Sequence, residues 1–243
     1  TSPGGETFDT QGGLYAYYSE MDSNGTFAMS PELLNNIGSG FNFLYPDGTL
    51  NVDDNTYKTT SFAAFGQVVW NYSEQLSATL GLRYTWEKKK STQRTIYLGF
   101  LSNASDENGG YSDFDGKWDE PTGKINVSWD ATDSVMAYAT LSRSYKSGGF
   151  NPISAESPLL DPALGGNPDY AEFEPEYINA LELGVKSRLL DDTLQANVTY
   201  FYYDYDGLQI GKITNQTSIN ENFDATIQGL EGEFIWLPDD RWR

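Results

Sequence analysis

The sequence predicts an all-β protein: an antiparallel up-and-down transmembrane β-barrel of the outer-membrane type, present as a partial barrel of about eight strands. Three observations predict it: apolar and polar residues alternate with period two, short turns alternate with long connections, and tryptophans precede the short turns. Because successive side chains of a strand point to opposite faces, period two gives a sheet with one apolar face. Alternating short and long connections are typical of a barrel with short periplasmic turns and long extracellular loops.

The strands follow in order from this alternation. The clearest is 76–86, where apolar or aromatic residues at even positions alternate with polar or small residues at odd ones. Its length suits a tilted transmembrane strand, which needs ~9–11 residues. Segments 124–130 and 194–202 repeat the pattern, and 228–236 does so less regularly. The expected strands lie at residues 12–19, 59–73, 76–90, 119–131, 134–147, 177–188, 193–206 and 223–237.

The connections between these strands alternate in length. Short polar turns are expected at 73–75, 131–133, 190–192 and 238–240, and long connections at 20–58, 91–118, 148–176 and 207–222. Tryptophans at 70, 129 and 236 precede short turns, whereas Tyr84 and Trp86 lie at the opposite end of their strand. Aromatic rings at two levels are the girdles of a membrane barrel. Alternation alone also fits a soluble β-sandwich or β-helix, in which the apolar face is the core.

Composition excludes several classes of function. Asp and Glu outnumber Lys and Arg by 35 to 15, and a formal charge of -20 repels a phosphate backbone, so no nucleic-acid partner is expected. The chain has no His and no Cys, which excludes His-based triads, thiol nucleophiles, disulfides and the usual zinc sites. The sequence contains no run of 18 apolar residues, so no transmembrane helix is expected. We therefore expect no enzyme, no catalytic residue, no cofactor and no metal.

Four phrases in the second half of the chain resemble TonB-dependent receptors. The first is LSRSYKSGGFNP at 141–152, followed by FEPEYINALELGVKS at 173–187, by 194–209 with its YFYYDYDGLQ string, and by GLEGE at 229–233. Each phrase is weak alone, but the four keep the family's order over about 110 residues. Before residue 120 the sequence resembles the family only in its general character, without a matching phrase.

This resemblance implies the C-terminal β-barrel of an active outer-membrane transporter of a Gram-negative bacterium. Such receptors capture a scarce, bulky nutrient, classically an iron–siderophore complex. An N-terminal plug fills the barrel, and energy arrives through TonB. Residues 1–243 are then expected to be one partial barrel domain without plug or terminal strands, with a ninth strand starting at 241–243. The alternatives are a passive outer-membrane porin and a soluble carbohydrate-binding β-protein. The expected partners are outer-membrane lipid, the TonB complex and a small-molecule or metal-chelate ligand.

Ligand contacts are expected in the long connections and at the lumen rim, because loops recognise ligands when a rigid scaffold positions them. Aromatic faces among many acids suit a neutral or cationic ligand better than a polyanion. The candidate ligand-binding residues are Tyr45, Trp118, Ser144, Lys146, Phe150 and Tyr170.

Two acidic groups invite chemical interpretations that we do not favour. The acids at 113, 115, 119 and 120 suggest a calcium site, but their spacing departs from an EF-hand loop and fits a solvated acidic loop. Glu231 and Glu233 share a strand face, as the two carboxylates of a glycosidase would, yet a polar lumen is normally lined with such charges.

Strand parity assigns side chains to the two faces. The convex, lipid-facing side is expected to carry Leu76, Leu80, Leu82, Ile125, Val127, Val198, Leu230, Phe234 and Trp236. The concave side is expected to carry Arg83, Lys124, Asn126, Gln195, Asn197 and Glu231. The sheet should be curved and open, with two unpaired edges.

Overall fold

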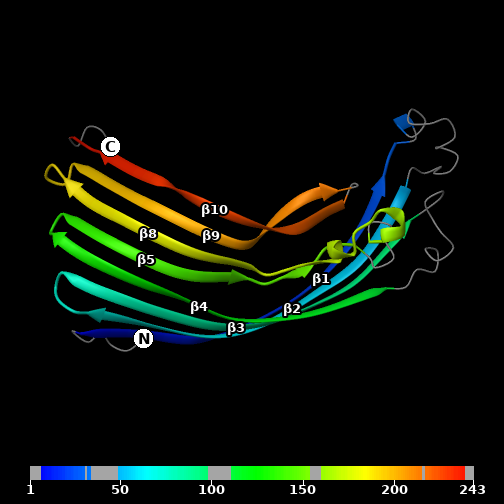
Figure 1. Ribbon diagram of the computed structural model, residues 1–243, viewed down its shortest axis with the longest axis horizontal. Coiled ribbons are helices and arrows are strands. Elements are labelled where there is room, and N and C mark those ends of the chain that lie inside the picture. The colour runs from blue at the N-terminus through cyan, green and yellow to red at the C-terminus, as the bar shows by residue number, and fades with distance from the viewer. Residues whose placement is uncertain are drawn as a thin grey trace.

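Eight long strands form one curved antiparallel sheet in a computed structural model that describes residues 7–30, 32–33, 49–97, 111–153, 160–214 and 217–238 (Figure 1). Each long strand after β1 pairs with the long strand before it in the chain, in the order β1-β2-β3-β4-β5-β8-β9-β10. This confirms the predicted meander and the partial, open barrel, with β1 and β10 at its edges. The strands are β1 (Phe8–Ala28), β2 (Thr49–Asn71), β3 (Leu76–Tyr97), β4 (Ser112–Thr132), β5 (Val135–Lys146), β8 (Glu176–Leu189), β9 (Leu194–Thr214) and β10 (Thr217–Trp236).

The segment between β5 and β8, residues 147–175, interrupts the meander and is called the excursion below. It contains β6 (Gly149–Phe150) and β7 (Glu172–Phe173), which pair with each other, and the 3-10 helices η2 (Pro162–Leu164) and η3 (Pro168–Ala171). Figure 1 shows it in yellow-green between the far ends of β1–β4 and of β9–β10. Among the described residues, no helix has the length and apolar character needed to cross a membrane.

Three of the four short turns lie within two residues of where the alternation predicted them, whereas residues 239–243, with the end of the fourth turn and the predicted ninth strand, lie outside the described residues. β2 and β3 are joined through residues 72–75, β4 and β5 through 133–134, and β8 and β9 through 190–193. In the last turn Leu190, Asp191 and Asp192 all have positive φ, at 55°, 52° and 65°. Asp tolerates this left-handed conformation better than most residues, whereas Leu adopts it at a cost.

Three of the four predicted long connections were too long, and the structure corrects them, whereas 148–176 agrees with the segment between β5 and β8. Predicted loop 20–58 contains the outer parts of β1 and β2, and predicted loop 91–118 contains the ends of β3 and β4. Within predicted loop 207–222, all but residues 215–216 belong to β9 and β10. Beyond the membrane no lipid covers one face of a hairpin, so the apolar–polar alternation stops while backbone pairing continues. A method that relies on alternation therefore ends these strands too early.

Strand register confirms the predicted division into two faces. Val68 pairs with Leu80, Leu80 with Ile125, and Ile125 with Leu141, so one apolar row crosses β2 to β5 on a single face. Leu80 is 48% exposed and Leu230 76% exposed. Only four apolar side chains are buried in the part of the chain described: Ala63, Ile153, Leu160 and Ile219. A soluble protein would bury such a row, so its exposure here fits the predicted lipid-facing side.

Candidate ligand-binding lumen

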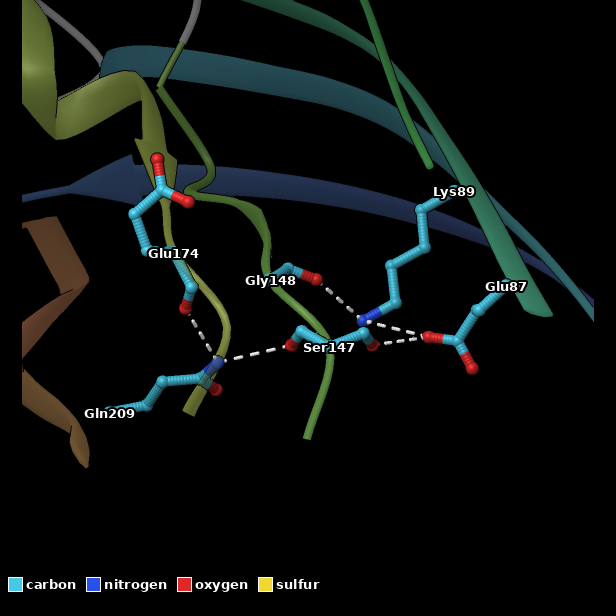
Figure 2. Close-up of polar contacts among 6 residues, drawn as sticks. All are labelled: Glu87, Lys89, Ser147, Gly148, Glu174 and Gln209. Atoms are coloured by element: carbon cyan, nitrogen blue, oxygen red, sulfur yellow. Dashed lines mark hydrogen bonds and ion pairs between the residues drawn. The ribbon is translucent and has the colours of Figure 1, made fainter. Parts of the chain in front are cut away.

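The excursion after β5 crosses onto the polar face of β3. The Ser147 hydroxyl donates a hydrogen bond to Glu87, and the Lys89 ammonium donates to the Gly148 carbonyl at 2.8 Å (Figure 2). Lys89 Nζ also lies 3.4 Å from Glu87 Oε1. Gly148 is required for this approach, because a Cβ there would lie 2.5 Å from the carbonyl oxygen of Phe173. The chain is thus fixed to β3 as soon as it leaves β5.

Gln209 of β9 holds both ends of the same excursion. Its Nε2 donates to the carbonyls of Ser147 and Glu174, each at 3.0 Å (Figure 2). Its backbone N–H donates to the Glu176 carboxylate at 2.9 Å. One side-chain amide therefore joins the point where the chain leaves the wall to the point where it returns.

Asn151 links the excursion to β3 and β10. It is fully buried, and its Nδ2 donates to the carbonyls of Tyr170 at 2.9 Å and Asn220 at 3.0 Å. Its Oδ1 accepts from the Asn220 N–H at 2.7 Å, and its own carbonyl accepts from Gln93 Nε2 at 2.9 Å. Gln93 lies on β3 and Asn220 on β10, far apart in the sheet order. A segment that contacts both through the polar face lies inside the curvature, so this face lines the lumen.

Aromatic side chains gather where the excursion meets β4. The Phe150 ring stacks on Phe114 with centroids 5.5 Å apart and lies 6.2 Å from Trp118. Lys89 Nζ lies 5.6 Å from the Trp118 ring, a cation–π distance. The result is an aromatic platform with one cation beside it.

Tyr170 lies on the other side of the excursion, facing β10. It packs against the buried cluster of Ile153, Leu160 and Ile219, and Lys212 Nζ lies 5.2 Å from its ring. A groove of about 510 Å³ between the excursion and β10 is lined by Tyr170. Its charged lining residues are all acidic: Asp169, Glu172, Glu174 and Glu221.

Ion pairs shift the pKa values of charged side chains on the outer parts of the strands. The Glu221 carboxylate, 2.5 Å from Lys212 Nζ, raises the pKa of Lys212. On β4, hydrogen bonding and attraction from Lys88, reinforced by Lys90, lower the pKa of Asp115. Both groups therefore stay charged across the ordinary range of pH.

Three of the four acids that suggest a calcium site bond to β3, and the fourth, Glu120, accepts a hydrogen bond from the Tyr177 hydroxyl of β8 at 2.7 Å. Asp113 accepts from the Thr92 hydroxyl at 2.7 Å, Asp119 from the Tyr84 hydroxyl at 2.6 Å, and Asp115 pairs with lysines. No group of three or more potential metal ligands forms among the residues that the structure places. Glu233 accepts a hydrogen bond from Asn197 Nδ2 at 2.9 Å, as a lumen-lining carboxylate does.

The structure brings some of the predicted ligand residues together. Trp118 and Phe150 meet, Tyr170 lines the acidic groove of the same excursion, and Ser144 and Lys146 are exposed where β5 leads into it. Tyr45 lies outside the described residues. Sequence reasoning missed four residues that hold the excursion in place: Lys89, Gln93, Asn151 and Gln209. Two of them, Asn151 and Gln209, lie within the phrases at 141–152 and 194–209.

A family model described as "TonB dependent receptor-like, beta-barrel" matches residues 2–243. The chain belongs to this family. Its members are receptors and transporters of the Gram-negative outer membrane, not enzymes, so the resemblance in the four phrases is confirmed. Family membership leaves the passive porin and the soluble carbohydrate-binding protein without support.

Individual relatives agree with the family assignment. The pesticin receptors of Yersinia enterocolitica and Yersinia pestis are 26% identical over 210 residues, covering 85% of this chain and 28% of each receptor. The structure of the ferric yersiniabactin uptake receptor from Yersinia pestis superposes with a TM-score of 0.72 at 17% identity, covering 98% of this chain and 31% of that one. A copper transporter gives a TM-score of 0.64 at 17% identity, over 96% and 33%. The chain thus spans less than a third of the curated relatives it matches.

Proposed function

We propose that the complete receptor takes up an iron–siderophore complex, or a similar bulky nutrient, across the outer membrane with energy supplied through TonB. Residues 1–243 form part of its barrel, and a plug domain elsewhere in the protein fills the lumen. Family membership supports the mode of transport. The names of the pesticin receptors and of the ferric yersiniabactin uptake receptor support a ferric chelate as cargo.

The observation that carries the proposal is the excursion fixed across the lumen. Hydrogen bonds to β3, β9 and β10 hold it rigidly, and a rigidly held loop is suited to recognition. We assign ligand contact to Tyr45, Trp118, Ser144, Lys146, Phe150 and Tyr170. Aromatic faces stack on the planar chelating groups of a siderophore, and the acidic groove beside Tyr170 disfavours a polyanion.

Binding to the purified complete receptor tests the proposal. Ferric hydroxamate, catecholate and phenolate chelates are titrated while tryptophan fluorescence is followed. We expect saturable quenching by at least one chelate, loss of most of the quenching in Trp118→Phe, and about tenfold weaker binding in Phe150→Ala. Trp129→Phe is the matched control, because Trp129 lies on the same strand but on the lipid face. Correctly folded receptor that binds none of the chelates contradicts the proposal.

A further inference from the structure

The lipid-facing side of the sheet has a groove where β4 and β5 separate. Their pairing stops at Gly123 and Arg143, while β4 continues to pair with β3 as far as Ser112. Pro121 lies two residues beyond the last pair, where a residue without an N–H is tolerated on a strand edge. The groove has a volume of about 500 Å³ and is lined from β3, β4, β5 and β8.

The outward walls of the groove are apolar. Leu80, Leu82, Ile125 and Leu141 line it, and all four belong to the exposed apolar face. In the membrane these side chains meet acyl chains, so the groove offers an acyl chain more contact than a smooth barrel wall does.

Arg143 lies at the extracellular end of this groove. Its Nη1 donates to Asn179 Oδ1 at 3.0 Å, and its guanidinium lies 4.9 Å from the centroid of the Tyr177 ring. Both partners are uncharged, and the Tyr177 hydroxyl in turn donates to Glu120 Oε1 at 2.7 Å, but no carboxylate forms an ion pair with Arg143 among the described residues. Lysines farther out are different: Lys58 is paired with Glu20 at 2.7 Å.

Arg143 lies below the level of the aromatic girdle, two residues from the row of Leu80 and two from the row of Tyr84. Two residues span about 7 Å at the rise of a strand. A long basic side chain reaches the headgroup level from this depth. Lys124 also borders the groove, but its side chain lies on the lumen face beside Gly81, so Arg143 is the cation that the lining presents to lipid.

We propose that this groove binds a phosphorylated acyl lipid of the outer leaflet. An acyl chain lies along the leucines, and a phosphate accepts hydrogen bonds from Arg143. The guanidinium is a planar fork that matches phosphate oxygens, and a neutral headgroup would leave this lipid-facing charge without a counter-ion. The site does not depend on the transport proposal, because it lies on the opposite face of the wall from the lumen.

Native mass spectrometry of the delipidated complete receptor tests the site. The probes are diphosphoryl lipid A and the same lipid stripped of its phosphates. We expect about tenfold more bound diphosphoryl lipid, and Arg143→Gln should remove this preference. Arg188→Gln is the matched control, since it removes one exposed positive charge near the short-turn end of β8. Leu141→Trp fills the groove, keeps Arg143, and should also lower lipid binding.

Four results would overturn the proposal. Wild-type receptor could bind both lipids equally, Arg143→Gln or Leu141→Trp could bind as wild type while correctly folded, or Arg188→Gln could lose the preference equally. A wild-type dimer that Leu141→Trp separates would also overturn it, since a second copy would then occupy the groove. If Arg143→Gln does not fold, Arg143→Lys replaces it and should recover part of the preference, because lysine keeps the charge without the fork.

Discussion

Asn151 shows how one side chain can fix a loop inside a lumen. Its amide satisfies a donor and an acceptor of Asn220 and an acceptor of Tyr170 in a fully buried position. The residue occurs in a phrase that the sequence singled out, but its partners lie on β10 and in the excursion itself. The sequence predicted that this region mattered without indicating what it contacts.

Replacing Asn151 with Ala should loosen the excursion without unfolding the wall. Three part-buried backbone groups lose their partners, at a cost of about 1 kcal/mol each. Hydrogen exchange measured on the complete receptor should rise in residues 147–153 and 160–175 and stay unchanged in β3 and β4. Ser144→Ala, an exposed change on β5, is the control. Unchanged exchange in the excursion would show that Asn151 does not hold it.

Two adjacent residues of β3 test which face meets lipid. Leu80 belongs to the exposed apolar row, whereas its neighbour Thr79 pairs with Asn126 on the lumen face. Leu80→Arg should destabilise the complete receptor by ~2–4 kcal/mol, because a charge near mid-bilayer has no water, while Thr79→Arg should have a mild effect. The measurement is urea unfolding in liposomes. Equal losses at the two positions would contradict the assignment of faces.

At the scale of elements, the membrane part of each strand was predictable and the outer part was not. Lipid on one side and water on the other impose period two on segments such as 76–86. The outer parts of β1 to β4, β9 and β10 have no lipid on one side to impose that period, so strand pairing and, for β3, β9 and β10, contact with the excursion keep them extended. The two-residue strands β6 and β7 have no periodicity at all, because a tertiary contact creates them.

Replacing residues 148–175 with a four-residue Gly/Ser turn should abolish ligand uptake and preserve the barrel. Lys146 pairs with Glu176, so the ends to be joined are already adjacent. Surface labelling of whole cells measures insertion, and accumulation of a radioactive ferric chelate measures uptake. Replacing the short turn 133–134 with Asn-Gly is the control and should change neither. Full uptake by the shortened receptor would move recognition to other loops or to the plug.

At the scale of the whole molecule, the strands of the barrel wall hold the excursion, and the excursion bridges strands that are far apart in the wall. The excursion contacts β3 on one side and β9 and β10 on the other, across the inside of the curve (Figure 1). Family, faces and topology follow from local patterns, and these were predicted. The contacts of Lys89, Gln93 and Gln209 depend on strands that are distant in sequence, so residue type and spacing alone did not indicate them.

Uptake of a ⁵⁵Fe-labelled chelate by whole cells tests the central claim most directly. A strain without the receptor is complemented with the complete gene, with and without a functional TonB, and offered the ferric chelate that binds most tightly to the purified protein. We predict accumulation that requires both the receptor and TonB, while surface binding of the chelate persists without TonB. Accumulation that is equal with and without TonB would contradict active, TonB-dependent transport through this barrel.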